Sequence, residues 1–124
     1  MTTTIERVPT VVRTSDTFRL FWHLLPGAND VRAKVLRRAG DDVAGMLLVE
    51  PDGAIDPHMH EHGGHDMYVL EGRCWFGGDL LTTGDYVHVP AGVTHSLAGA
   101  GPTGARLLYV ASGGALDPPD AAAT

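Results

Sequence analysis

The chain has 124 residues and a formal net charge of −6, from nine Lys and Arg against fifteen Asp and Glu. This length suits one domain, and the negative balance argues against the basic surfaces that bind nucleic acid or anionic membranes. Hydrophobic residues make up 44% and charged residues 19%, which excludes a disordered chain. We expect one folded domain with neither nucleic acid nor membrane as a partner.

The beginning of the sequence lacks the basic segment and apolar run of a signal peptide. No apolar stretch approaches the ~20 residues that a membrane-spanning helix needs. The single cysteine, Cys74, excludes an internal disulfide and a multi-cysteine zinc site, and we interpret it as a small buried hydrophobe. We expect a cytoplasmic protein.

The first 30 residues are expected to form an arm that packs on the folded domain or on a partner subunit. Apolar residues gather near its end, among them Phe18, Phe21 and Trp22, and a turn follows at 26–30. These side chains present more apolar surface than so small a domain can bury alone, which favours a homodimer. At the other end, residues 113–124 are expected to form a flexible tail.

Between these ends, residues 31–112 are a series of short apolar runs separated by Gly, Pro and Asp. Turn signals spaced roughly 8–12 residues apart are typical of β-sandwiches and barrels, so the sequence predicts an all-β domain. For 31–38 a short helix is an open alternative. The predicted strands are 31–37, 43–50, 55–60, 65–71, 73–76, 79–82, 85–90, 94–98 and 105–110.

Seven histidines are the most unusual feature of the composition. His58 and His60 are two residues apart, so both side chains point to the same face of a strand. A reversal at Gly63–Gly64 would bring His65 back opposite this pair, and His95 follows a tight turn later in the chain. If the strands close into a small barrel, these four imidazoles converge inside it. Neutral imidazoles suit one divalent ion of Zn, Fe, Mn, Ni or Cu.

The other three histidines and two of the tyrosines are assigned no role at this site. His23, His62 and His88 are interpreted as surface residues, the commoner place for a lone histidine. Strand alternation is expected to point Tyr68 and Tyr86 outward.

The stretch 57–72 resembles the first motif of the cupin superfamily, in which an H-x-H pair is followed by a Glu ligand and then by a Gly. His58 and His60 match the pair, and Gly72 stands near the position of the Gly. His65 occupies the place of the usual Glu. Four neutral imidazoles leave a divalent ion with its full charge, so the site is a strong Lewis acid that attracts an enolate, phenolate or carboxylate.

The stretch 84–95 resembles the second cupin motif, G-x5-P-x-G-x2-H, and ends at His95. The resemblance covers residues 43–98. The resemblance implies a double-stranded β-helix, or jelly-roll barrel. Single-domain cupins that resemble this chain are often dimers, with their N-terminal strands packed across the interface. The metal ligands that it implies are His58, His60, His65 and His95.

All-histidine cupin sites are similar to those of metal-dependent dioxygenases that cleave β-diketones or aryl ketones, and this is the function expected first. An aromatic polyketide cyclase or isomerase with a non-redox metal is an alternative, and so is a metal- or ligand-binding cupin without turnover, because the fold alone does not decide function. No side chain is assigned as the catalytic group, and the reacting group is expected to be a metal-bound water or O2. The expected lining of the substrate pocket is Met46, Met67, Val69 and Phe76, with ordinary core packing as the alternative for each.

Overall fold

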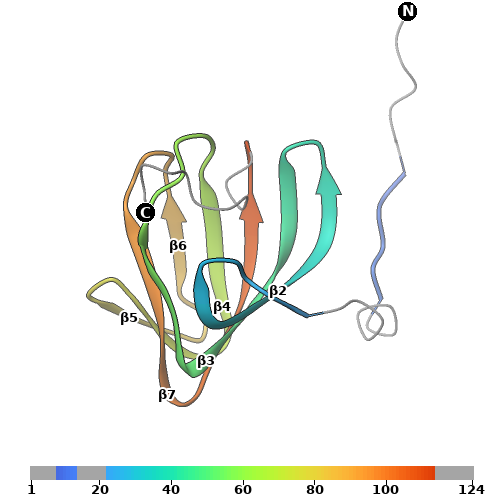
Figure 1. Cartoon of the computed structure of the whole chain (residues 1–124). Helices are drawn as coiled ribbons and strands as arrows, with labels where there is room; N and C mark the ends of the chain where they lie inside the picture. Colours follow the sequence, from blue (N-terminus) through green and yellow to red (C-terminus); the bar gives the residue numbers. More distant parts are fainter. Residues whose placement is uncertain (1–7, 14–21, 114–124) are drawn as a thin grey trace, which may run out of the picture.

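The computed structural model describes residues 8–13 and 22–113, and all regular structure in them is β-strand (Figure 1). The short helix considered for 31–38 is wrong, because these residues pair with a neighbouring strand. No helix among the described residues is long and apolar enough to cross a membrane. The strands are β1 (His23–Leu24), β2 (Ala28–Ala39), β3 (Asp42–His58), β4 (His65–Phe76), β5 (Asp79–Thr82), β6 (Tyr86–Val89) and β7 (His95–Ala111).

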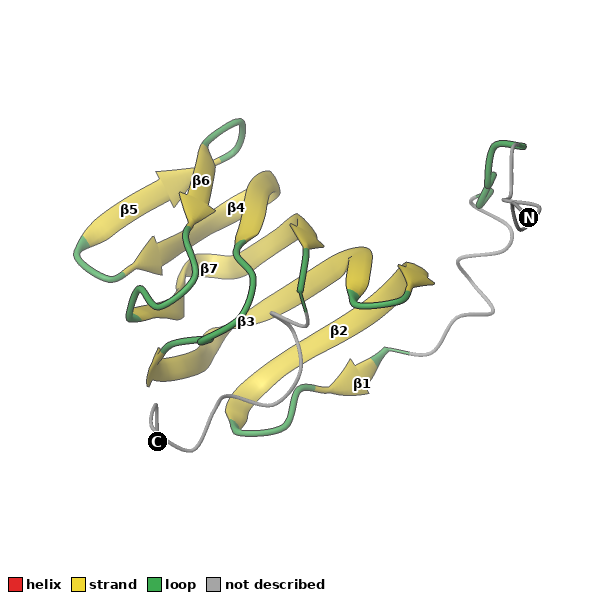
Figure 2. Ribbon diagram, turned by 90° about the horizontal axis from the view of Figure 1, so that it is seen from above, coloured by secondary structure: helices red, strands yellow, loops and turns green. Residues whose placement is uncertain are grey.

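The strands form one antiparallel sheet in the order β1-β2-β3-β7-β4-β5, and β6 pairs with β4. Three long strands run through both halves of this sheet. The first half of β3 pairs with residues 105–111 of β7, whereas its end pairs with 95–98. β4 follows the same division along β7. The sheet therefore wraps around itself, as Figure 2 shows from above, which confirms the expected jelly-roll class.

The long strands are longer than the sequence predicts. Segments 43–50 and 55–60 were expected to be separate strands, and so were 94–98 and 105–110, yet each pair belongs to one strand that bends without ending. Gly104 lies at such a bend with φ of +69°, and its Cα packs against the Val49 carbonyl, where no side chain fits. Glycines in this chain therefore bend the sheet as well as interrupt it.

Alternation along the strands separates an inner from an outer face. In β3, Val43, Leu47 and Val49 are buried, while Ala44 and Met46 between them are half-buried on the other face. Burial of the inner apolar side chains drives the two halves of the sheet together. The fully buried core side chains of largest volume are Tyr109, Leu107, Val31, Val49, Val69 and Cys74.

The segment expected to be an arm divides into two parts. From His23 onward it belongs to the sheet, because β1 and the start of β2 find backbone partners there. Trp22 lies beside this edge, with its ring 4.5 Å from Lys34 Nζ. Residues 8–13 are exposed and lie apart from the barrel (Figure 1). Phe18, Phe21 and most of the expected tail lie outside the described residues.

Candidate metal centre and cavity

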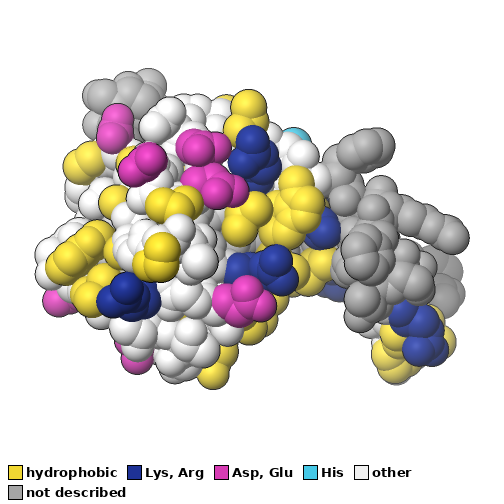
Figure 3. Space-filling view, turned by 90° about the horizontal axis from the view of Figure 1, so that it is seen from below, with side chains coloured by type: hydrophobic (Ala, Val, Ile, Leu, Met, Phe, Trp, Pro, Cys, Tyr) yellow, Lys and Arg dark blue, Asp and Glu magenta, His cyan; other side chains and the backbone are white. Residues whose placement is uncertain are grey.

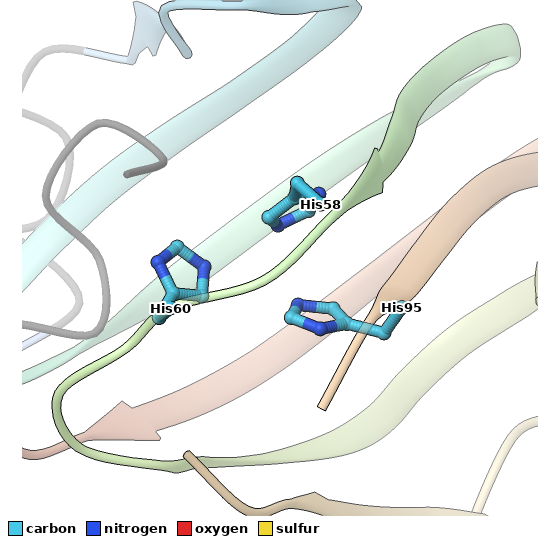
Figure 4. Close-up of side chains that lie close together, drawn as sticks. All are labelled: His58, His60 and His95. Atoms are coloured by element: carbon cyan, nitrogen blue, oxygen red, sulfur yellow. The ribbon is translucent and has the colours of Figure 1, made fainter. Parts of the chain in front are cut away.

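Four histidines come together at one end of the barrel interior. His58 is the last residue of β3 and pairs directly with His95, the first residue of β7. His60 follows in the next loop, and His65 begins β4. Figure 4 shows the rings of His58, His60 and His95 converging on a common point.

Three of the rings form the tightest group. Ligand nitrogens of His58, His60 and His95 all lie within 4.8 Å of one another. His65 stands beside this group, with its ring centroid 4.8 Å from that of His95 and 5.7 Å from that of His60. Two nitrogens bound to one ion at ~2.1 Å lie no more than about 4.2 Å apart. The ligand nitrogens, all within 4.8 Å of one another, therefore lie close to this limit.

Backbone carbonyls fix the tautomers of two of these rings. His58 Nδ1 lies 2.7 Å from the Asp56 carbonyl oxygen, and His95 Nδ1 lies 2.9 Å from that of Val93. Because a carbonyl can only accept, each Nδ1 carries the proton and donates it. Each Nε2 therefore presents a lone pair, which is the state that a metal ligand needs.

Burial keeps His65 and His95 neutral. It lowers the pKa of His65 from 6.5 to about 3, with further lowering by His95, His60 and His58. Burial also lowers the pKa of His95, although its hydrogen bond to Val93 opposes the effect. Neutral imidazoles bind divalent ions without first losing a proton, so the donor set fits a metal such as zinc or iron.

One turn positions both His60 and His95. Residues 90–93 form a turn in which Val93 N–H donates to the Pro90 carbonyl at 3.3 Å, and Gly92 takes a φ of +80° in its third position. Gly92 N–H in turn donates to the His60 carbonyl at 2.7 Å. The turn before β7 thus holds the loop that carries His60, which explains why a Pro-x-Gly sequence precedes His95 at this spacing.

A cavity of about 280 Å³ opens beside the histidines. It is slightly smaller than the usual lower limit of about 300 Å³ for small-molecule pockets. Side chains of both halves of the sheet line it, and the β1–β2 segment covers one side. The lining residues are His23, Leu24, Leu25, Pro26, Arg38, Leu47, Ile55, His58, His60, His65, Met67, His95, Leu97 and Tyr109.

Of the four residues expected to line the pocket, only Met67 is among the lining residues. Met46 lies on the outer face, between buried Gly45 and Leu47. Val69 is fully buried in the core two residues beyond Met67. Phe76 stacks on the ring of His95 at 6.1 Å, where it supports the histidine from behind.

The remaining singled-out residues lie mostly as expected. Cys74 is fully buried, and burial raises the pKa of its thiol to about 11, which suits a packing role. Tyr68 and His88 lie on the outer face. His23 is exposed as expected, and it also lines the cavity from β1.

Sequence reasoning missed Arg38 and Tyr109 in the lining. Alternation from Ala105 through Leu107 would have placed Tyr109 on the inner face. Nothing in the sequence marks Arg38, because a register shift between Val35 and Arg37 reverses the alternation in β2.

A family model for the cupin domain matches residues 45–111, more than half of the chain. The chain belongs to the cupin family. No curated protein sequence matches it.

Solved cupin structures resemble it over most of its length. The polyketide cyclase RemF from Streptomyces resistomycificus is 25% identical, with a TM-score of 0.71 over 85% of this chain and 80% of that chain. A predicted oxalate decarboxylase from Thermotoga maritima is 20% identical, with a TM-score of 0.71 over 84% and 99% of the two chains. A chain from the complex of Rhodobacter sphaeroides SigE with the anti-sigma ChrR is 23% identical, with a TM-score of 0.64 over 79% and 51%. The last two likenesses concern the fold alone.

Proposed function

We propose that this cupin is a metal-dependent enzyme that binds an enolisable ketone and cyclises it, in the manner of an aromatic polyketide cyclase. The observation that carries the proposal is the cluster of His58, His60, His65 and His95 at the wall of a cavity otherwise lined mainly by apolar side chains. No Asp or Glu lines this cavity among the described residues. The site therefore favours a substrate that brings its own negative charge.

The histidines would hold the ion, with His65 completing the tight group of three. A divalent ion bound there supplies Lewis-acid stabilisation of an enolate oxygen. The Nδ1–H bonds of His58 and His95 keep their Nε2 atoms aimed at the centre. Met67, Leu97 and the β1–β2 segment line the cavity, where they would exclude water and hold an apolar ring system beside the ligands.

A dioxygenase that cleaves a β-diketone or aryl ketone is the second candidate, since it would use the same all-histidine ligand set. The cyclase is favoured because RemF, a polyketide cyclase, is similar to this chain over 85% of its length. The two functions diverge in whether O2 is consumed and in whether a carbon–carbon bond of the substrate is broken or a new ring is closed.

The test uses protein loaded with Zn2+ or with Fe2+, and benzoylacetone as the enolisable probe. A cyclase site is expected to accelerate hydrogen–deuterium exchange at the carbon between the two carbonyls with Zn2+, without O2 uptake. His58→Ala should abolish the acceleration, whereas His88→Ala should keep it. O2 uptake with Fe2+ and cleavage of the probe would establish the dioxygenase instead. Absence of any metal-dependent effect would exclude both.

We further propose that two copies of the chain form a homodimer. Exposed apolar side chains on the outer face support this proposal, among them Tyr68, Leu70, Tyr86 and Val110. Val8 and Val11 are also exposed, on a segment that lies apart from its own barrel (Figure 1). Light scattering should give twice the 13.1 kDa chain mass, and a monomer mass would contradict the proposal.

A further inference from the structure

Arg38 lies on the same inner face as the metal-ligating histidines. Its backbone position begins a row of paired residues that crosses the sheet through Val43 and Ala111 to His65. Three strand spacings separate Arg38 from His65, which is about 14 Å along the sheet. Arg38 is exposed and lines the cavity, so its side chain stands at the opening.

The Arg38 guanidinium makes no hydrogen bond or ion pair with any residue in the described parts of the chain. Arg32, by contrast, pairs with Asp30 and Glu50, and Arg106 pairs with Glu71. Arginine is always charged and carries five donors in a planar fork. Arg38 therefore keeps its full capacity to bind an anion.

Tyr109 supplies a second donor beside Arg38. Its side chain is buried and lines the cavity, and its hydroxyl makes no hydrogen bond to a described residue. The phenol leans over Gly45, where a Cβ would overlap the hydroxyl. Burial raises the pKa of Tyr109, an effect that the nearby Arg38 charge opposes, so the hydroxyl keeps its proton as a donor.

The charge of the lining also points to an anion. Arg38 is the one Lys, Arg, Asp or Glu among the described lining residues, in a chain whose formal net charge is −6. On the surface seen in Figure 3, acidic and basic side chains are interspersed. The cavity is thus electropositive within an acidic protein, an arrangement that concentrates anionic ligands.

We propose that Arg38 and Tyr109 form a carboxylate-binding subsite, so that the substrate is an enolisable keto acid with its carboxylate about one aromatic ring away from the reacting carbonyl. This inference rests on the proposed function, because it assumes that the enolate end occupies the histidines. A carboxylate matches the guanidinium fork with two parallel hydrogen bonds, and Tyr109 adds a third. The cavity volume of about 280 Å³ restricts such a substrate to one or two rings.

The test compares the affinities of two probes for the Zn2+-loaded protein by calorimetry. Benzoylacetone carries only the enolisable diketone, and 4-(acetoacetyl)benzoate adds a carboxylate across the ring. The wild type is expected to bind the carboxylated probe at least about tenfold more tightly. Arg38→Gln should remove this preference and leave the affinity for benzoylacetone unchanged. Arg38→Lys should keep part of the preference, since it keeps the charge without the fork.

Arg37→Gln is the matched control. Arg37 is the neighbouring exposed arginine on β2, and the register shift places it opposite half-buried Ala44 on the outer face. This variant should keep the full preference, and Tyr109→Phe should reduce it about threefold. A preference that survives Arg38→Gln, or that the wild type lacks, would overturn the subsite.

The two proposals fail in different ways. Zn2+-dependent binding of benzoylacetone without a carboxylate preference would leave the metal function standing and remove the subsite. The opposite result is that the carboxylated probe binds zinc-free protein through Arg38 and that neither probe depends on metal. This result would leave the subsite standing and remove the metal function.

Discussion

The two faces of the β4–β6 pair carry histidines in opposite environments. On the inner face, His65 is buried, neutral and surrounded by other imidazoles. On the outer face, His88 Nδ1 lies 2.7 Å from the Asp66 carboxylate, which also accepts a hydrogen bond from the Tyr86 hydroxyl. We refer to Asp66, Tyr86 and His88 as the outer cluster. His65 and Asp66 are neighbours in sequence, and strand alternation alone separates them.

The difference shows how the protein assigns its histidines. Among the described residues no carboxylate lines the cavity, and burial lowers the pKa of His65 and His95, so these two imidazoles stay neutral with lone pairs available for a metal. In the outer cluster, hydrogen bonds from Tyr86 and His88 lower the pKa of Asp66 and hold it as a carboxylate. Strand alternation keeps that carboxylate on the outer face, away from the metal centre. Half-exposed pairs of this kind contribute little to stability.

The largest expected effect separates the two faces by metal affinity. His58→Ala, His60→Ala and His95→Ala each remove a nitrogen from the tight group, and we expect the zinc affinity to fall by about 100-fold or more. His88→Ala, on the outer face, should leave it unchanged. Competition with a chromophoric chelator measures both. Equal losses for inner and outer variants would contradict the assignment of the site.

His65 sharpens the comparison, because it stands beside the tight group rather than within it. We expect His65→Ala to weaken zinc binding by about tenfold, less than the other ligands. His65→Glu should preserve binding, since it restores the oxygen ligand common in the family. An unchanged affinity in His65→Ala would reduce the ligand set to three.

Acidification should destabilise the metal-free protein through the inner-face residue His65. The pKa of His65 is about 3 when folded and about 6.5 in an unfolded chain. Below pH 6.5 the unfolded state therefore binds a proton that the folded state rejects, and the free energy of unfolding decreases as the pH falls toward 3. His65 contributes up to about 1.4 kcal/mol per pH unit in this window.

Urea titrations of the wild type and His65→Gln between pH 7 and pH 4 would measure this contribution. The variant should show the shallower pH dependence by about that amount. Parallel curves would mean that His65 is not buried as neutral imidazole.

The smallest effect is expected within the outer cluster. His88→Ala removes one hydrogen bond from Asp66, so the pKa of that carboxyl should rise toward its ordinary value. The free energy of unfolding at neutral pH should change by less than about 1 kcal/mol, because the pair is half-exposed. An NMR titration of Asp66 provides the pKa. A larger loss of stability would show that the cluster supports the sheet.

Much of the candidate site could be predicted, because it depends on local spacing. The two-residue spacing keeps His58 and His60 close together even though β3 ends at His58, and the Gly-rich loop reverses the chain before His65. The pocket lining could not be predicted in the same way. Val69 points inward as predicted but lies in the core, because whether an inward position borders a cavity depends on the strands opposite. Met46 lies on the outer face, because the alternation of its strand has the opposite phase to the expected one.

The sequence by itself determined the all-β class, the turns and the two histidine motifs, because these depend on residues close together in the chain. Only the tertiary structure decided which arginine enters the cavity. The register shift in β2 turns Arg38 inward and Arg37 outward, and bulges of this kind arise from pairing with another strand. The same holds for Tyr109, whose phenol needs the space above Gly45 on the neighbouring strand. The position of Tyr109 depends on a contact between segments more than 60 residues apart, the pairing of Gly45 with Tyr109, which local sequence patterns do not encode.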